Sequence, residues 1–427
     1  MRDYETLLAE LHTRPRYAKK KDLHRIQALM AKLGDPQKDL RFVHIAGTNG
    51  KGSVSAMTAS ILRCAGVHAV GLFTSPYLKE FTERIQINGK KIPKNDFCRL
   101  YEHVYQAECA LEAAGQDPAN EFEIITAIAM LWFSELSCDW VVLEVGLGGR
   151  LDATNVIPPQ KVCCITQLGL DHQAQLGSTL SEIAAEKAGI IKPESIVVTP
   201  ATQAPEALAV LQSVCEKQGA SLCVTSSPEL IQLFPDKTRF SYKEAQYSVS
   251  LAGAHQAHNA ACAIEIAAAL GISDSAIREG LQTVSWPGRL DQISAAPCVV
   301  LDCGHNPNGI TALRKALHEA YDDRPYALLM AMMQDKDYER CVETIATDAV
   351  RFTATTLDMP RALSAENLKT CASSVCEKAC AVSDVRKALE SAVRALQEDE
   401  MLVICGSVYL AGEILKILDE GFSFDKK

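Results

Sequence analysis

A glycine-rich segment at residues 47–53, with the sequence GTNGKGS, places the strongest constraint on the fold of this chain. It follows an apolar run at residues 41–45 and precedes a stretch with helical periodicity at residues 53–64. A strand, a glycine turn and a helix in this order are typical of a phosphate-binding loop, because backbone N–H groups, the helix dipole and a lysine converge on the anion. Lys51 supplies the positive charge, although Gly52 stands where Ser or Thr usually follows the lysine. A purely structural turn is the alternative.

Apolar runs alternate with helical patterns along the rest of the chain. We expect further strands at residues 69–73, 140–145, 162–165 and 196–199, and helices at residues 95–114, 121–136 and 255–270. Residues 242–251 alternate as in an antiparallel strand, and a second series of strands is expected at residues 298–302, 327–331, 350–354 and 402–405. We therefore predict an α/β fold, with a P-loop-type, mostly parallel ATPase domain at residues 1–293 and a smaller Rossmann-like α/β domain at residues 294–427.

Composition argues against several classes of protein. The chain has 427 residues, of which 48% are hydrophobic and 22% charged, as in a soluble globular protein of two or three domains. A formal net charge of -10 argues against nucleic acid or an anionic membrane as the partner. Residues 1–11 lack the apolar stretch of a signal peptide, and no membrane span is expected. The sixteen cysteines include no Cys-x-x-Cys pair, so we expect reduced, mostly buried thiols in a cytoplasmic protein.

Several polar residues stand where the expected strands and helices of the first domain end. Ser75 follows the second strand, where it either ligates Mg²⁺ or caps a helix. Glu144 ends an otherwise apolar strand, so it either binds a metal or pairs with Arg150. His172 and Lys187 follow later elements, and each alone is also consistent with a partly buried histidine or a salt-bridged lysine. Ligands gather at the carboxyl ends of parallel strands, which favours a binding site here.

A second group of polar residues surrounds the expected domain junction. Asn259 lies in the segment HQAHN, and Arg289 ends the segment WPGR. Asp302 and His305 come directly after the first strand of the second domain. An arginine at a hinge and an Asp/His pair at a strand end suit a nucleotide held between two domains, although each residue alone has a structural alternative.

Taken together, these segments resemble the folylpolyglutamate synthase/dihydrofolate synthase family, a branch of the Mur ligase superfamily. The resemblance runs from about residue 24 to residue 416 and rests on the motifs HIAGTNGKGS, TSPYLKEFTERIQING, EFEIITA, LEVGLGGRLDATN, LDH followed by LGSTLSEIAAEKAGIIK, GAHQAHNAA, WPGRL, LDCGHNP, QDKD and CGSVYLAGE. Tyr77, Gln173 and Cys303 depart from residues that are common in the family, but they remove no expected ligand.

The resemblance implies roles for individual residues. The implied catalytic set is Lys51, Glu144, His172, Lys187 and Arg289. Two Mg²⁺ ions are implied, with the ligands Ser75, Glu144, His172 and Lys187, the last as a carbamate. The implied ATP contacts are Thr48, Asn49, Gly50, Lys51, Gly52, Ser53, Asn259, Arg289, Asp302 and His305. The segments that match the pterin pocket are Glu121, Phe122, Glu123, Leu151, Asp152 and Ala153.

The implied reaction is an ATP-dependent ligation of L-glutamate to a folate-type carboxylate, through an acyl phosphate and with release of ADP and phosphate. The substrate is dihydropteroate, a reduced folate or both, and the implied state is a monomer. A Mur-type peptide ligase is one alternative, but those enzymes carry a nucleotide-sugar domain ahead of the phosphate loop, for which the position of Gly47 leaves no room. The other is an ATP-dependent switch or binding protein, which has no evident use for Lys187 and His172 together.

Overall fold

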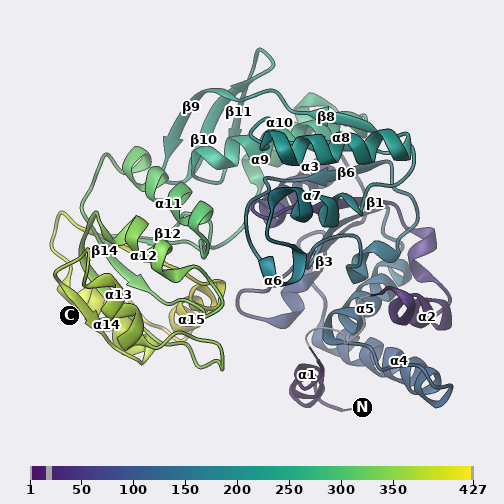
Figure 1. Ribbon diagram of the computed structural model, residues 1–427, viewed down its shortest axis with the longest axis horizontal. Helices are drawn as coiled ribbons and strands as arrows, with labels where there is room; N and C mark the ends of the chain where they lie inside the picture. The colour runs from purple at the N-terminus through teal and green to yellow at the C-terminus, as the bar shows by residue number, and fades with distance from the viewer. Residues whose placement is uncertain (1, 16–21, 425–427) are drawn as a thin grey trace. The chain divides into compact units, whose positions relative to one another are not determined.

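The computed structural model describes residues 2–15 and 22–424 and divides the chain into two compact units (Figure 1). The first unit comprises the chain up to Pro76 and the segments Thr82–Ser227 and His258–Thr283; the second comprises Tyr77–Phe81, Pro228–Ala257 and the chain from Val284 onward. This division differs from the single boundary expected at residues 293/294. That boundary falls within β12 (Asp291–Ala295), which pairs antiparallel with β13 (Cys298–Leu301), so the hydrogen bonds of this pair keep both sides in one unit.

An eight-stranded sheet forms the centre of the first unit. Its strands are β1 (Phe42–Ala46), β2 (Val70–Phe73), β3 (Ile85–Ile87), β4 (Lys90–Lys91), β5 (Trp140–Glu144), β6 (Val162–Ile165), β7 (Ile196–Thr199) and β8 (Ser221–Val224). The strand order is β4-β3-β2-β5-β1-β6-β7-β8, and every pair from β2 to β8 is parallel. β1 and β6 are buried along their whole length, which explains why β6 is a continuous apolar run and why β1 is apolar except for His44.

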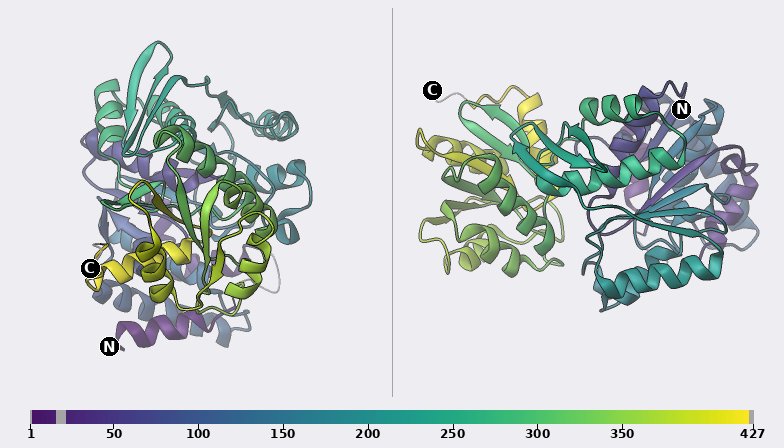
Figure 2. Two further views of the ribbon diagram at one scale, coloured as in Figure 1. Left: turned by 90° about the vertical axis from the view of Figure 1, so that its left-hand side faces the viewer. Right: turned by 90° about the horizontal axis from the view of Figure 1, so that it is seen from above.

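Helices cover both faces of this sheet (Figure 2). The helices that lie wholly or mostly in this unit are α1 (Tyr4–His12), α2 (His24–Lys32), α3 (Lys51–Cys64), α4 (Lys94–Ala113), α5 (Glu121–Glu135), α6 (Gln173–Leu176), α7 (Leu180–Ala188), α8 (Pro205–Gln218), α9 (Ala254–Ala269) and α10 (Asp274–Thr283), with the short 3₁₀ helices η1 (Pro36–Asp39), η2 (Phe81–Arg84) and η3 (Ala153–Val156). Capping boxes begin α5, through Asn120 and Glu123, and α7, through Thr179 and Glu182. The first cap fixes the start of α5, where the expected site residues Glu121, Phe122 and Glu123 lie, and the second fixes the start of α7, whose last turn carries Lys187.

The second unit contains two sheets. The six-stranded sheet has the order β12-β13-β17-β14-β15-β16 and includes β14 (Tyr326–Met330), β15 (Ala349–Ala354), β16 (Ala379–Ala381) and β17 (Met401–Cys405). The antiparallel sheet comprises β9 (Glu229–Phe234), β10 (Lys237–Tyr242) and β11 (Ala245–Val249). The strand expected at residues 242–251 is therefore shorter, because Tyr242 ends β10 and the positive φ angles of Lys243 and Glu244 form the turn of the hairpin.

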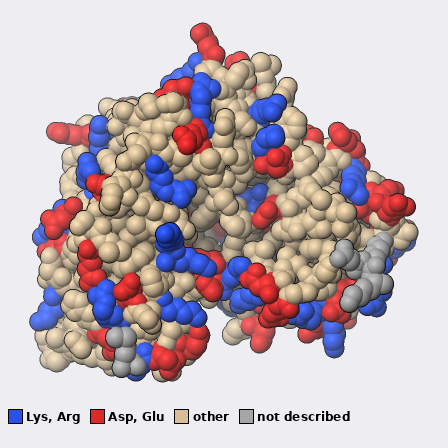
Figure 3. Space-filling view, turned by 180° about the vertical axis from the view of Figure 1, so that it is seen from behind, with Lys and Arg blue, Asp and Glu red and all other residues tan. Residues whose placement is uncertain are grey.

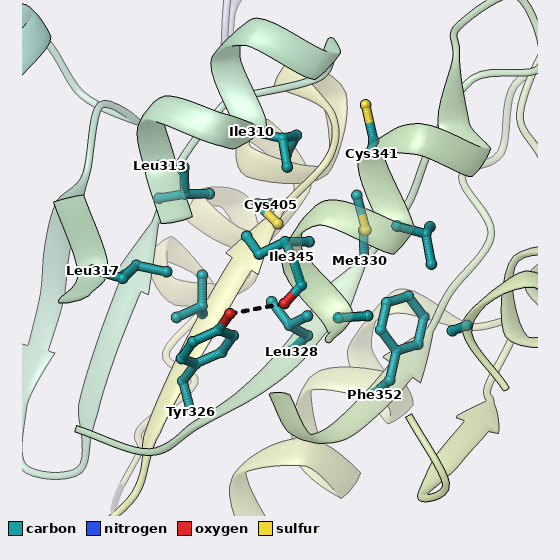
Figure 4. Packing of buried hydrophobic residues seen from close by; sticks show 14 of the residues in the cluster. Ile310, Leu313, Leu317, Tyr326, Leu328, Met330, Cys341, Ile345, Phe352 and Cys405 are labelled. Carbon is teal, nitrogen blue, oxygen red and sulfur yellow. Dashed lines mark hydrogen bonds between the residues drawn. The ribbon is translucent and has the colours of Figure 1, made fainter. Parts of the chain in front are cut away.

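The hydrophobic core of the second unit lies on both faces of its six-stranded sheet. On one face, Leu328 and Met330 pack against α11 (Pro307–Ala320), α12 (Tyr338–Ala346) and α13 (Ala365–Ala372). On the other face, Leu329 packs against α14 (Val385–Ala395) and α15 (Val408–Asp419). Figure 4 shows the first face, where the Tyr326 hydroxyl donates a hydrogen bond to the Ile345 carbonyl at 2.8 Å. The predicted α/β fold with a mostly parallel first sheet and a smaller Rossmann-like part is confirmed.

The distribution of charged side chains and the burial of the cysteines match what the composition predicts. Acidic and basic side chains are interspersed with uncharged ones on the face in Figure 3. All sixteen cysteines are free, and most of them are buried. Within residues 2–15 and 22–424, no helix has the length and apolar character that crossing a membrane requires.

Candidate active site

The glycine turn joins the carboxyl end of β1 to the first residue of α3. The backbone N–H groups of Thr48 and Asn49 both donate to the Gln167 carbonyl at 3.1 Å, and the Thr166 hydroxyl donates to the Asn49 carbonyl at 2.8 Å. Gly50 precedes α3 with φ +88° and makes no side-chain cap hydrogen bond. The loop after β6 thus holds the beginning of the turn, and the N-terminus of α3 has the arrangement that binds phosphate.

Two glycines in this turn are in very close contact with other segments. A Cβ atom at Gly47 would lie 1.8 Å from Thr166 Oγ1, and a Cβ atom at Gly50 would lie 2.4 Å from Asn259 Oδ1. Asn259 is on α9 and is almost fully buried. The structure therefore brings together two of the expected nucleotide contacts, the turn and Asn259, although about two hundred residues separate them in the sequence.

The first turn of α3 consists of Lys51, Gly52 and Ser53. Lys51 is partly exposed, and its Nζ donates to the Thr48 carbonyl at 3.4 Å. Gly52 and Ser53 are buried. Lys51 is therefore a partly exposed cation beside the turn, where its ammonium can reach an anion bound at the helix N-terminus.

Glu144 and Ser75 meet at the carboxyl ends of two neighbouring parallel strands. β2 pairs with β5, so that Phe73 lies opposite Leu143, and the Ser75 backbone N–H donates to Glu144 Oε2 at 3.2 Å. Glu144 is 4% exposed and lies opposite Ile45 of β1, the strand that leads into the glycine turn. The alternative ion pair with Arg150 is not formed, because Arg150 binds Glu186 at 2.7 Å.

Lys187 lies in the last turn of α7 and is 5% exposed. Its Nζ donates to the Gly47 carbonyl at 2.7 Å, so the lysine reaches the first residue of the glycine turn. Burial, and then the Lys51 ammonium, lower the pKa of Lys187 to about 7, while the carboxylates of Asp171 and Asp152 oppose this shift. The short hydrogen bond of Lys187 is thus made to a backbone carbonyl and not to a carboxylate, as the alternative of a simple salt bridge required.

His172 precedes α6 in the left-handed conformation, with φ +52°. Its backbone N–H donates to Asp171 Oδ1 at 2.8 Å, and its Nε2 lies 4.0 Å from Asp171 Oδ2. Asp171 has no role in the sequence prediction, yet it acts electrostatically on Lys187 and orients the backbone of His172. Its position after a buried strand, beside a histidine, was the signal that could have identified it.

The donor atoms at these strand ends fit a Mg²⁺ ion that is shared with phosphate. Among the residues that the structure describes, no three His, Cys, Asp or Glu side chains form a metal cluster. Mg²⁺ does not need such a cluster, because it commonly binds one or two carboxylates together with phosphate oxygens and water. The buried Glu144 carboxylate, next to Ser75, is a donor of this kind.

The expected pterin-pocket residues at the start of α5 differ in their surroundings. The Phe122 ring covers Gly146 so closely that a Cβ atom there would lie 2.5 Å from the ring. Glu123 is buried and binds Arg25 at 3.1 Å in addition to capping α5, whereas Glu121 is partly exposed. Phe122 is therefore the member of this set that contacts the loop after β5, and Glu123 has structural partners.

The other expected pterin-pocket segment closes the loop that follows β5. Asp152 Oδ2 accepts the Leu147 N–H at 2.8 Å, and the same carboxylate caps η3. Burial raises the pKa of Asp152, and the hydrogen bonds that it accepts oppose this shift. Leu151 is partly exposed, and Ala153 is buried.

Arg289, Asp302 and His305 form a separate group within the second unit. Asp302 follows β13, and its two oxygens accept the N–H groups of Leu290, at 2.8 Å, and Gly304, at 2.7 Å. Burial raises the pKa of Asp302, and the Arg289 guanidinium opposes this shift. His305 Nδ1 lies 2.9 Å from a backbone carbonyl of its own loop. Asp302 thus joins the loop that carries Arg289 to the loop that carries His305.

The structure shows the surroundings of Tyr77, Gln173 and Cys303, the three residues that depart from the family pattern. Cys303 packs against Gly288, where a Cβ atom would lie 2.7 Å from its sulfur, and burial raises the pKa of the Cys303 thiol to about 12. The Tyr77 ring contacts the edge of Phe81, with centroids 5.4 Å apart. Gln173 begins α6.

Comparisons with known proteins match both parts of the chain. Residues 45–267 match the Mur ligase middle domain, and residues 288–408 match the Mur ligase glutamate ligase domain. The dihydrofolate synthase/folylpolyglutamate synthase of Bacillus subtilis (strain 168) is 37% identical over 97% of this chain and 99% of its own length. The folylpolyglutamate synthase of Lacticaseibacillus casei is 34% identical over 99% of this chain and 100% of its own length.

Solved structures match at the level of the whole chain. The Mycobacterium tuberculosis folylpolyglutamate synthase complexed with ADP has a TM-score of 0.91 and 30% identity, covering 99% of this chain and 98% of its own. The structure of E. coli FolC in complex with DHPP and ADP has a TM-score of 0.85 and 27% identity, covering 98% of both chains. Because both domains and nearly the full length of these enzymes are matched, the chain belongs to the dihydrofolate synthase/folylpolyglutamate synthase family of ATP-dependent ligases, within the Mur ligases.

Proposed function

We propose that this enzyme joins L-glutamate to a folate-type carboxylate, that of dihydropteroate, of a reduced folate or of both, at the expense of ATP. The observation that carries the proposal is the glycine turn at the strand ends where Lys51, Glu144 and Lys187 also lie. The names of the relatives and the ADP and DHPP bound in their structures support the same substrates. A peptide ligase is less well supported, because the matches to the folate enzymes extend over nearly the whole chain.

The first step activates the carboxylate, which is a poor acyl donor. A substrate carboxylate oxygen attacks the γ-phosphorus of ATP in line, the bond from that phosphorus to the β–γ bridging oxygen breaks, and ADP leaves. Lys51 and the N-terminus of α3 neutralise the charge on the phosphate oxygens. The product is an acyl phosphate.

The second step forms the amide. The amine of L-glutamate attacks the acyl carbon, the new carbon–nitrogen bond forms, and the bond from that carbon to the phosphate oxygen breaks. Phosphate leaves with the electron pair, and the nitrogen loses its proton. The chain's own residues contribute by positioning the reactants and by stabilising charge, which is sufficient for this chemistry once the carboxylate is activated.

Bound Mg²⁺ supplies further neutralisation of the phosphoryl oxygens. Ser75 and Glu144 would hold one ion, and Glu144, His172 and Lys187 the second. For this role Lys187 must be a carbamate, in which Nζ bonds to the carbon of CO₂ and loses a proton. The burial of Lys187, the low pKa of its amine and its contact with the glycine turn support this modification, because only the neutral amine reacts with CO₂.

The remaining assignments concern the nucleotide and the folate. We assign the nucleotide contacts of the second unit to Arg289, Asp302 and His305, and those of the first unit to Asn259 and the glycine turn. The folate-type substrate is assigned to the segments around Phe122 and Asp152 that contact the loop after β5. A monomer is expected, and light scattering of the purified chain tests that state.

An ADP-release assay with product analysis tests the function. The purified chain receives ATP, Mg²⁺ and L-glutamate together with dihydropteroate, with tetrahydrofolate, or with a nucleotide-sugar peptide. We expect ADP release with both pterin substrates and products heavier by one glutamyl residue. Ligation only to the nucleotide-sugar peptide would identify a peptide ligase, and ADP release without any ligated product would identify an ATP-driven switch. Either result would contradict the proposal.

A further inference from the structure

A histidine lies at the centre of β1, a strand of the first sheet that is buried at every residue. His44 is the middle residue of β1, is 0% exposed, and lies between apolar neighbours. Its Nε2 is 2.9 Å from Thr154 Oγ1, and its Nδ1 has no hydrogen-bond partner among residues 2–15 and 22–424. Burying an imidazole lowers the stability of the fold unless the ring is hydrogen-bonded. The hydrogen bond to Thr154 offsets part of this cost for His44.

The hydrogen bond from His44 continues to a carboxylate. The Thr154 hydroxyl donates to Asp152 Oδ1 at 2.5 Å, the Thr154 N–H donates to the same oxygen at 3.0 Å, and the Leu147 N–H donates to Oδ2 at 2.8 Å. Both oxygens of Asp152 therefore accept hydrogen bonds. The single hydroxyl proton of Thr154 is used in its hydrogen bond to Asp152, so the Thr154 oxygen accepts a hydrogen bond from His44 Nε2–H. His44 therefore donates a hydrogen bond to Thr154, and Thr154 donates one to Asp152.

This chain of hydrogen bonds links the two halves of the site. β1 leads directly into the glycine turn, and Asp152 closes the loop that follows Glu144. We propose that His44 is a positioning residue, which acts through Thr154 to fix Asp152 and the loop of residues 146–152 in the orientation that binds the folate-type substrate. The inference rests on the proposed function, because it assigns Asp152 to that substrate.

The surroundings of His44 make it a fixed donor and not a proton carrier. Burial, and then the ammonium of Lys192, lower the pKa of His44 to about 3. The imidazole is therefore neutral at physiological pH, and its proton lies on Nε2. Burial lowers the pKa of Lys192 as well. Asp152 is the acidic group at the other end of this series of hydrogen bonds.

Two matched pairs of variants separate positioning from simple packing. Thr154→Val keeps the shape but removes the hydroxyl, whereas Thr154→Ser keeps the hydroxyl. His44→Asn places its amide near the position of Nδ1, whereas His44→Gln places an N–H near the position of Nε2. We expect Thr154→Val and His44→Asn to raise KM for the folate substrate about tenfold, the effect of losing one buried hydrogen bond, with KM for ATP unchanged. Thr154→Ser and His44→Gln should stay within about threefold of the unmodified enzyme.

The readouts are steady-state kinetics with dihydropteroate and tetrahydrofolate, and ¹⁵N NMR of histidine-labelled enzyme. The spectrum should show His44 as the Nε2–H tautomer with no titration between pH 5 and 8. A loss of thermal stability with unchanged KM for folate in Thr154→Val and His44→Asn would overturn the inference, as would an Nδ1–H tautomer. If the unmodified enzyme ligates glutamate to neither substrate, the proposed function fails, whereas the NMR result still decides the direction of the hydrogen bonds.

Discussion

Replacing Gly50 by alanine perturbs the phosphate turn at one defined point. The φ angle of +88° costs an alanine about 1–2 kcal/mol of folding free energy. In addition, the new Cβ atom would lie 2.4 Å from Asn259 Oδ1, whereas ordinary contact begins at 3.4 Å, so the Asn259 amide must retreat by about 1 Å. A misplacement of this size costs about 100-fold in rate, and we expect kcat/KM for ATP to fall by about that factor.

Gly34→Ala is the matched control. Gly34 has φ +85°, and a Cβ atom there would meet nothing within 4 Å, so this variant shares the backbone strain and lacks the steric contact. Urea unfolding should show a loss of about 1–2 kcal/mol in Gly34→Ala and a loss at least as large in Gly50→Ala, whose Cβ atom also displaces Asn259. ADP-release kinetics should be impaired only in Gly50→Ala. Normal ATP kinetics in a folded Gly50→Ala protein, or an equal loss of kcat/KM in Gly34→Ala, would refute the reasoning.

Three further predictions concern single side chains. Lys51→Ala should lower kcat/KM by about 100- to 1,000-fold, as for other lost charge-stabilising donors, whereas Lys38→Ala, at a lysine that is 67% exposed, should keep normal ADP release. Lys187→Ala should be nearly inactive in the same assay and partly rescued by acetate, and Lys187→Arg should remain inactive; full activity in CO₂-depleted buffer would argue against the carbamate. Hydrogen bonds to Asp348 and Asp323 raise the pKa of His318. The stabilisation that these bonds give the folded state is therefore complete below the ordinary histidine pKa and is lost as pH rises through the raised pKa. Because the side chain is 38% exposed, His318→Gln should lower the unfolding free energy, measured in urea, by only about 0.5 kcal/mol at acidic pH and by less at pH 8.

Much of the fold follows from local sequence patterns. β6 and β7 have the bounds that the apolar runs predict, residues 162–165 and 196–199, because strands buried on both faces are continuous apolar segments. The short edge strands β4 and β16 lack this signal, since they are exposed or partly exposed and contain only two or three residues. The assignment of Tyr77–Phe81 to the second unit was also not predictable, because it depends on contacts with residues that lie far along the chain.

The sequence by itself determined the glycine turn, its lysine and the strand-end positions of Ser75 and Glu144, because the local order of strand, glycine and helix is enough to specify them. Only the tertiary structure decided the partners. Arg150 binds Glu186 instead of Glu144, and Lys187 reaches a carbonyl of the glycine turn 140 residues away. Such hydrogen bonds act over about 3 Å, so a side chain acquires its partner only when packing of the whole sheet brings distant segments within that reach.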